Sequence, residues 1–190
     1  MSSSLIDENT VRWYVLRDLK RANAKQRAYL LFQEKNMEVF TPMKSRLVVV
    51  KGKRVRQEVP CIPDLLFVHD SRENLDPIVE ETSTLQYRWL RNKYREPMTV
   101  TDAEMERFIR AVHASDLPKY YLPEEITPEM LNRPIRIVGG PLDGYEGTLL
   151  TTRGSKVKRL LLEIPSLLAV GVEVNPEYIQ FVWYTFFLSR

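Results

Sequence analysis

"IVGGPLDGYEGTLL", residues 137–150, holds four of the seven glycines in this 190-residue chain: Gly139, Gly140, Gly144 and Gly147. Neither the GxxxxGK[ST] pattern of a phosphate-binding loop nor the GxGxxG pattern of a dinucleotide-binding loop occurs in it. The residues after Gly147 continue as a strand. Because glycine adopts positive φ angles without strain, we expect these four glycines to form tight turns between strands.

The sequence around this stretch predicts a series of short strands. Five apolar runs are separated by turn residues: IRIV (135–138), GTLLTT (147–152), KRLLLEI (158–164), VGVEV (170–174) and YIQFVW (178–183). Five such runs in about 50 residues are typical of a small closed β-barrel. The run at 158–170 also fits an amphipathic helix, but Pro165 and Gly171 disfavour a long one.

The first half of the chain alternates strand and helix patterns. RWYVLRDL (12–19) is rich in aromatic and β-branched residues and predicts a strand. The segment 22–35 then has helical periodicity, and Asn23 with Gln26 resembles a capping pair. Residues 37–70 predict a strand, a long hairpin and another strand, because prolines and the turn KGKR (51–54) interrupt the β-rich runs.

The strongest local signal is a helix that begins after Thr101. Thr101 is a good N-cap, Glu104 completes a capping box, and Val100 is placed to pack against Met105. A short helix near 72–82 and a short strand at 86–91 precede it. Beyond it, residues 114–132 contain three prolines and no periodicity, which predicts a linker.

Charge is distributed unevenly along the chain, whose net charge is +3. Residues 1–100 contain 18 lysines and arginines against 13 acidic residues, whereas residues 101–132 contain 3 against 7. Residues 133–190 contain 7 against 5. The basic first part favours a nucleic-acid partner, although charge runs also occur on ordinary solvated surfaces.

Composition argues against several classes of protein. No apolar run approaches the roughly 20 residues that span a bilayer, and the first ten residues lack the apolar core of a secretory signal, so we expect a cytoplasmic protein. Cys61 is the only cysteine, which leaves no internal disulfide and no cysteine-rich zinc site. Neither His69 nor His113 is paired with a nucleophile motif. We expect no catalysis, no metal and no cofactor.

Several motifs, in order, resemble one protein family. Directly after IRIV come Gly140, Pro141, Asp143, Gly144, Tyr145, Glu146 and Gly147, which resemble the KOW motif of an SH3-like barrel. Upstream, RWYV (12–15), TPM (41–43), GKR (52–54), PCIPDLLFV (60–68) and PMTVTDAEM (97–105) resemble the N-terminal domain of NusG-type transcription factors. The runs WYVL, GKR and LFV look closer to the RfaH paralogues, and the nearest resemblance is to the UpxY group of antiterminators.

The resemblance implies an α+β fold with two domains. The NusG N-terminal (NGN) domain, a mixed or antiparallel sheet flanked by helices, would cover residues 11–113, after a disordered N-terminus at 1–10. A linker at 114–132 would lead to the KOW domain at 133–190, a small SH3-like β-barrel. Refolding of that barrel from a helical hairpin, as in RfaH, is disfavoured here by Pro165 and Gly171. We expect a monomer.

The resemblance also implies a function. Such a factor docks on the clamp helices of RNA polymerase and suppresses pausing or termination during elongation, here at specific operons such as those for capsular polysaccharide synthesis. Its KOW domain would recruit a ribosomal protein or a termination factor. An alternative is a KOW-containing ribosome- or RNA-binding protein, which explains the barrel but not the motifs at 12–15 and 60–68.

Candidate site residues follow from matching positions. The polymerase-binding candidates are Tyr14, Cys61, Ile62, Pro63, Leu65 and Phe67, and we expect about half of them to face the core because strand side chains alternate. The chain has Asp64 where the family has glycine and Leu65 where an aromatic residue is usual. The candidates for binding non-template and upstream DNA are Arg17, Lys20, Arg21, Asn23, Lys25, Lys53, Arg54, Arg88 and Arg91, with Asn23 as a base reader.

Two further segments differ from the family. The His-Thr-Thr stretch that RfaH places near DNA is absent, and its matching place is near Asp76, Pro77 and Ile78. The ending FVWYTFFLSR (181–190) is unusually apolar. We expect it to extend the last strand and cover apolar surface, with a partner site as the alternative.

Overall fold

The computed structural model describes residues 9–20, 26–91, 93–151 and 154–182. The chain divides into two compact units, Met1–Asp102 and Ala103–Arg190. The expected disordered N-terminus and most of the apolar ending lie outside the described residues. No helix in the described ranges is long and apolar enough to cross a membrane.

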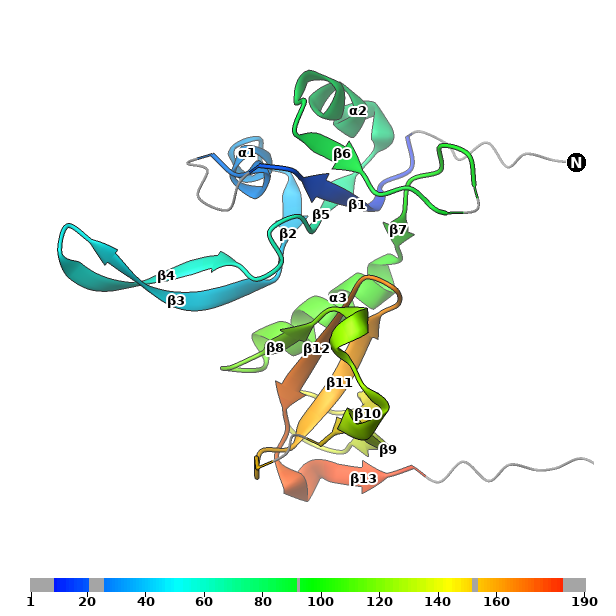
Figure 1. Ribbon diagram of the computed structural model, residues 1–190. Coiled ribbons are helices and arrows are strands. Elements are labelled where there is room, and N and C mark those ends of the chain that lie inside the picture. The colour runs from blue at the N-terminus through cyan, green and yellow to red at the C-terminus, as the bar shows by residue number, and fades with distance from the viewer. Residues whose placement is uncertain (1–8, 21–25, 92, 152–153, 183–190) are drawn as a thin grey trace, which may run out of the picture. The chain divides into compact units, whose positions relative to one another are not determined.

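Unit 1 is built on a five-stranded antiparallel sheet (Figure 1). Its strands are β1 (Arg12–Asp18), β2 (Glu38–Phe40), β5 (Leu66–Asp70), β6 (Leu85–Tyr87) and β7 (Thr99–Val100). The order is β2-β5-β1-β6, and β7 also pairs with β1. The predicted strand at 12–19 is therefore confirmed, and β1 is the central strand.

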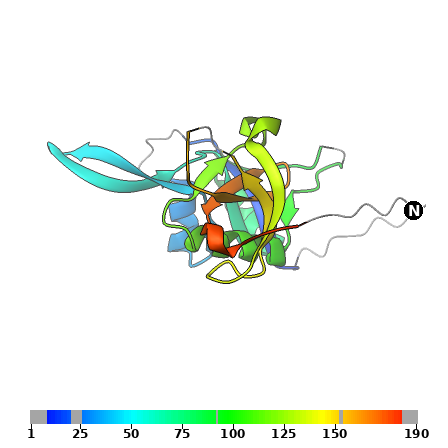
Figure 2. The same ribbon diagram turned by 90° about the horizontal axis from the view of Figure 1, so that it is seen from below.

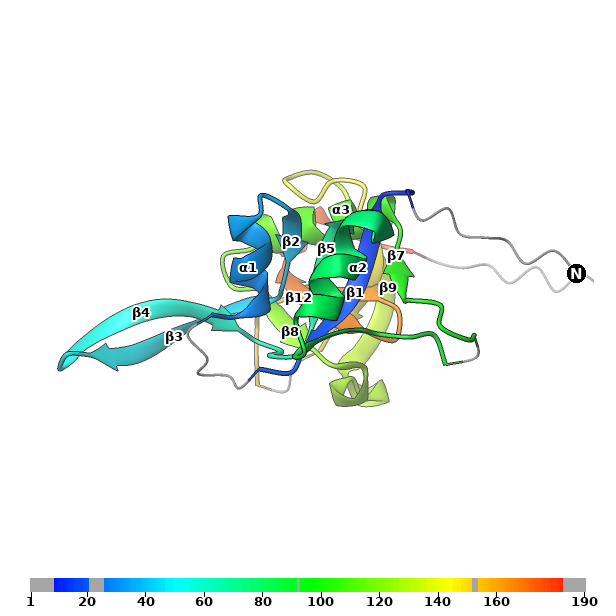
Figure 3. The same ribbon diagram turned by 90° about the horizontal axis from the view of Figure 1, so that it is seen from above.

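Two helices, α1 (Ala28–Glu34) and α2 (Arg72–Glu81), cover one face of this sheet (Figures 1 and 3). Tyr14 and Leu16 of β1 point into the core beneath them, together with Phe32 of α1 and Leu75 of α2. Because strand side chains alternate, Trp13 and Val15 lie on the opposite face. The sheet is thus apolar on both faces.

Helix α1 begins later than the sequence predicts. Its N-cap residue, Arg27, makes no side-chain capping bond. Instead, the Asp18 carboxylate accepts a hydrogen bond from the Ala28 backbone N–H at 2.9 Å. Gln26 precedes the helix and Asn23 lies outside the described residues. The cap comes from the end of β1, which a search for local capping pairs does not detect.

The predicted hairpin is formed by β3 (Met43–Val50) and β4 (Lys53–Pro60), which pair along their whole length. It projects from unit 1 as a separate two-stranded ribbon (Figures 1 and 2). Lys51 and Gly52 form the two-residue turn, with φ angles of 49° and 76°. Positive φ at both central residues is the signature of a type I′ hairpin turn.

Unit 2 contains most of helix α3 and a six-stranded antiparallel sheet. Helix α3 (Asp102–His113) begins directly after Thr101, as predicted. The strands are β8 (Lys119–Tyr121), β9 (Leu131–Ile137), β10 (Glu146–Leu150), β11 (Arg159–Ile164), β12 (Leu168–Glu173) and β13 (Ile179–Phe181), and the short 3-10 helices are η1 (Pro123–Glu125), η2 (Pro128–Met130) and η3 (Pro176–Tyr178). All five predicted strands are present.

The segment expected to be a linker is structured. Strand β8 pairs with β12 through Ala169↔Tyr121 and Gly171↔Lys119, and η1 and η2 follow it. Two of its three prolines, Pro123 and Pro128, start the 3-10 helices. The sheet order is β13-β9-β10-β11-β12-β8, and among the described residues no pairing joins β13 to β8. Closure into a barrel stays a prediction.

Candidate functional site

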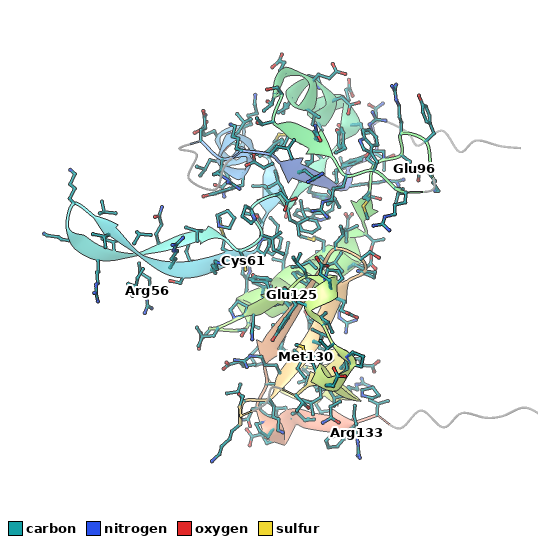
Figure 4. All side chains as sticks on the ribbon, viewed as in Figure 1. Arg56, Cys61, Glu96, Glu125, Met130 and Arg133 are labelled. Atoms are coloured by element: carbon teal, nitrogen blue, oxygen red, sulfur yellow. The ribbon has the colours of Figure 1, made fainter. Side chains whose placement is uncertain are left out.

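The β3–β4 hairpin concentrates positive charge. It contains six basic residues and one acidic residue, Glu58; the basic ones are Lys44, Arg46, Lys51, Lys53, Arg54 and Arg56. All six are exposed, and Figure 4 shows Arg56 out on the ribbon and Cys61 beyond its base. The predicted candidates Lys53 and Arg54 are therefore accessible to an anionic partner.

Apolar side chains lie between these charges. Leu47, Val49, Val50 and Val55 are all exposed, and Val49 retains 70% of its accessible surface. No residue of β3 or β4 belongs to the buried core. An isolated two-stranded ribbon is marginally stable in water, so a partner that covers this one would stabilise it.

A second basic group surrounds Asp64, in the loop before β5. Its carboxylate lies 3.3 Å from the Arg17 guanidinium and 3.5 Å from that of Arg88. The chain has an aspartate at this position where glycine was expected, and the structure gives the aspartate a role. It holds two of the predicted nucleic-acid-binding arginines together while cancelling part of their charge.

The remaining basic candidates behave differently from one another. Arg91 is exposed, and the Lys20 ammonium donates to the Gln26 carbonyl at 2.8 Å. Arg21, Asn23 and Lys25 lie outside the described residues, so their proposed role as DNA readers rests on sequence alone.

Arg27, which belongs to the same basic run as Lys20, is buried. Its Nε lies 3.3 Å from the Asp18 carboxylate, and it donates to the carbonyls of Lys20 and Pro63. This arginine supports the fold of unit 1, and its charge is not available to a nucleic acid.

Four of the six polymerase-binding candidates are buried. Tyr14, Leu65 and Phe67 are at most 2% exposed, and Ile62 is 9% exposed. Tyr14 belongs to the core beneath α1 and α2, so it lies on the wrong face to share a surface with Phe67. Burial thus takes four of the six, more than the half that was expected.

Cys61 and Pro63 retain accessible surface. The Cys61 N–H donates to the Pro42 carbonyl at 2.7 Å, and Pro63 receives the Arg27 guanidinium on its own carbonyl. The loop between β4 and β5 is therefore fixed at both ends. It presents two of the six predicted residues next to the Asp64 cluster, which consists of Asp64, Arg17 and Arg88.

His69 is held in a structural role. Its ring stacks on Trp13 with 4.9 Å between centroids, and its Nδ1 lies 2.8 Å from the Glu38 carboxylate. On the other side, Nε2 is 3.2 Å from the Asp102 carboxylate. No serine, threonine or cysteine takes part in these contacts, and the described residues contain no group of three or more His, Cys, Asp or Glu that could hold a metal.

Asp76, near the expected place of the His-Thr-Thr stretch, is engaged inside unit 1. Its carboxylate pairs with Arg72 at 2.7 Å and accepts a hydrogen bond from the Tyr87 hydroxyl at 2.7 Å. Burial, together with this hydrogen bond, raises the pKa of Tyr87 well above its ordinary value. This aspartate stabilises the packing of α2 on β6.

The glycine-rich stretch forms the turn between β9 and β10. Gly139, Gly140 and Gly144 have φ angles of 99°, 70° and 79°, as predicted for tight turns. The Asp143 carboxylate accepts the Gly139 N–H at 2.6 Å. A Cβ on Gly140 would come within 2.9 Å of the Tyr178 ring, so this glycine also makes room for an aromatic side chain.

The prediction of a tight turn is wrong for Gly147, because the φ angle of this residue is not positive. A Cβ there would lie 2.4 Å from the Leu161 carbonyl oxygen, across the pairing of β10 with β11. Close approach of two backbones, rather than turn geometry, explains the last glycine of the stretch.

Tyr145, in the same stretch, connects the turn to α3. Its hydroxyl donates to the Arg107 carbonyl at 3.1 Å, and the Arg107 guanidinium lies 5.1 Å above its ring. Arg107 also donates to the Glu146 carbonyl at 2.6 Å. These contacts join α3 to the turn between β9 and β10 within unit 2.

Comparison with known protein families identifies the family to which the first half of the chain is similar. A family model described as NusG, transcription termination factor, matches residues 11–109, slightly more than half of the chain. The chain belongs to the NusG family. No curated protein matches this chain. The NusG match contains the hairpin, the Cys61–Pro63 loop and the Asp64 cluster.

NusG-family proteins are transcription factors that bind RNA polymerase and act during elongation, termination or antitermination. The family works by binding rather than by bond chemistry.

Proposed function

We propose that this protein is a specialised elongation factor that suppresses pausing or termination at particular operons, such as those for capsular polysaccharide synthesis. The NusG match over residues 11–109 carries the proposal. The factor binds the pause-resistant conformation of RNA polymerase more tightly than the others. It thereby shifts the population toward that state without making or breaking a bond.

The polymerase clamp helices dock on unit 1 around the Cys61–Pro63 loop. The loop is anchored by Arg27 and by Pro42, so it presents a fixed shape to a partner. Ile62, Leu65 and Phe67 support it from the interior. The surface matches the position of the family's docking site, with Asp64 adding a charged neighbour.

Non-template and upstream DNA lie against the basic surfaces of unit 1. The hairpin offers six exposed cations, and the Asp64 cluster offers Arg17 and Arg88. Contacts of this kind go to phosphates and supply affinity and speed rather than sequence preference. Recruitment to a DNA element falls to Lys20, Arg21 and Lys25, with Asn23 as a base reader, because the His-Thr-Thr stretch of RfaH is absent from this sequence.

Unit 2 acts as the KOW domain, which recruits a ribosomal protein or a termination factor. The support is the glycine turn at 139–147 and the antiparallel strands on either side of it. An RNA- or ribosome-binding protein remains the alternative, but the NusG match lies mainly in unit 1, which that alternative does not explain.

The test is a pull-down with bacterial core RNA polymerase and the full chain. We expect Pro63→Glu to abolish binding, because it places a charge on the exposed loop without disturbing the backbone carbonyl that Arg27 uses. Pro165→Glu, an equally exposed proline in unit 2, is the matched control and should bind normally.

The single cysteine provides a second measurement. Alkylation of Cys61 by a maleimide should slow when polymerase is bound, because the loop is then covered. Failure of the folded wild-type chain to bind polymerase, with co-purification of ribosomes instead, would favour the alternative. If Pro63→Glu binds polymerase as well as wild type does, the docking surface does not include this loop.

A further inference from the structure

Residues 88–91 and 93–98, the described part of the connection from β6 to β7, form two antiparallel arms of a narrow projection. The Met98 N–H donates to the Arg88 carbonyl at 2.7 Å, and the Leu90 N–H donates to the Glu96 carbonyl at 2.9 Å. Trp89 and Pro97 form a bridge between these two bonds. Within unit 1 the loop projects on the side away from the β3–β4 hairpin, as Figures 1 and 3 show and as the Glu96 and Arg56 labels mark in Figure 4.

An aromatic side chain stands at the tip of this loop. Tyr94 is 89% exposed, the highest value among the large apolar side chains of the described residues. Trp89, lower in the loop, is 46% exposed and packs on Tyr87 with 5.6 Å between ring centroids. The exposure of Tyr94 excludes a core role for its ring.

One cation lies against that ring, and other basic residues flank it in the sequence. The Arg95 guanidinium lies 5.3 Å from the Tyr94 ring centroid, which leaves the opposite ring face open. Lys93 is paired with Glu96 at 2.8 Å, and Arg88 with Asp64. Among the described residues no ion pair engages Arg91 or Arg95, so these two keep their charge for a partner.

This combination suits single-stranded nucleic acid. Such strands are bound by aromatic rings that stack on unpaired bases and by cations that follow the phosphates, and each stacked base contributes about 1–3 kcal/mol. Tyrosine, tryptophan and arginine also occur at protein interfaces. Four basic residues against one acidic residue in this loop favour an anionic partner.

We propose that Tyr94, backed by Arg95 and flanked by Arg91, is a stacking site for an unpaired base of single-stranded DNA. The proposal rests on the proposed function, which brings unit 1 next to the non-template strand of the transcription bubble. Stacking on Tyr94 would supplement the phosphate contacts of the basic residues. The stacking site lies at the end of unit 1 opposite the β3–β4 hairpin.

The test measures binding of the full chain to a fluorescent oligothymidylate by anisotropy. Tyr94→Ala should weaken binding about 5- to 160-fold, whereas Tyr94→Trp should restore it because tryptophan also stacks. Phe181→Ala is the matched control, since Phe181 is also exposed and lies 5.8 Å from the Arg133 guanidinium, but in unit 2. That variant should bind as wild type does.

Two further arms identify the ligand. Binding to a duplex should be the same for Tyr94→Ala and wild type, because paired bases offer no free face. Single-stranded RNA should bind no better than DNA of the same sequence. Unchanged DNA binding by Tyr94→Ala, equal loss on duplex, or a preference for RNA would each overturn the proposal.

The polymerase pull-down separates this site from the proposed function. Tyr94→Ala should still bind core polymerase, because Pro63 and Cys61 are untouched. Loss of polymerase binding by Tyr94→Ala, with normal DNA binding, would instead make the tyrosine a protein contact and overturn the stacking site. A wild-type chain that stacks on DNA through Tyr94 but ignores polymerase would overturn the proposed function alone.

Discussion

Tyr87 shows how a single hydroxyl ties a helix to a sheet. It lies in β6, is 6% exposed, and its hydroxyl donates a hydrogen bond to the Asp76 carboxylate of α2. Ionisation would place two negative charges side by side in a desolvated position, which is why the pKa of Tyr87 is raised. Burial also raises the pKa of Tyr14, whose ring contacts that of Tyr87.

Alkaline pH should therefore destabilise unit 1. An unfolded tyrosine releases its proton near pH 10, whereas Tyr87 in the folded protein keeps its proton at that pH. The free energy that Tyr87 contributes to folding is therefore fully present below about pH 10 and is lost as the pH rises toward the folded pKa. Urea unfolding at several pH values should show a smaller alkaline loss for Tyr87→Phe than for wild type. Tyr94→Phe, at an exposed site, should follow wild type; equal slopes for all three would refute the account.

At the scale of elements, the β3–β4 hairpin depends on its turn more than on the core. Gly52 has a φ of 76° with open space around it, so an alanine there meets backbone strain without a clash. Gly52→Ala should weaken the hairpin by about 1–2 kcal/mol. Because no hairpin residue belongs to the buried core, the urea midpoint of the whole chain should hardly move.

Hydrogen exchange measures this directly. Amides that pair β3 with β4 should exchange about 5- to 30-fold faster in Gly52→Ala, while those of β1 and β5 stay unchanged. Gly52→Asn should behave more like wild type, since asparagine tolerates the left-handed region. A general rise in exchange would mean that the hairpin supports the core after all.

The same scale shows what a sequence predicts well. The hairpin, α3 and five strands of unit 2 were predicted because their signals are local: turn residues, a capped amphipathic helix and short apolar runs. Strand β8 was missed because its register with β12 is set by a residue fifty positions away. The start of α1 was missed for the same reason, since its cap is Asp18.

Site residues divide in the same way. Charge is visible in sequence, so Lys53 and Arg54 of the hairpin were named. The pairing of Arg17 and Arg88 with Asp64 depends on three separate segments and was not predicted. Tyr94 was not named, although an aromatic between Lys93 and Arg95 was a readable signal. The proposed stacking by Tyr94 depends on the exposure of its ring, and that exposure is known only from the folded structure.

For the whole molecule, the chain passes from unit 1 to unit 2 within the first turn of α3, since unit 1 ends at Asp102 and unit 2 begins at Ala103. A fragment of residues 114–190 would lose both hydrogen bonds of Arg107 with the glycine turn and its contact with the Tyr145 ring. We expect it to be about 2–3 kcal/mol less stable in urea than a fragment of residues 103–190. Equal stability of the two fragments would mean that these contacts of α3 do not stabilise unit 2.

The charge on the β3–β4 hairpin has a consequence beyond binding. Each strand has an outer edge of unpaired backbone groups, eight residues long and rich in valine, which is the kind of edge that joins neighbouring molecules into aggregates. Lysines and arginines along both strands keep such ribbons apart by repulsion. Replacing them with alanine to map DNA contacts would thus also favour precipitation, and glutamate replacements would keep the molecules apart while reversing the charge.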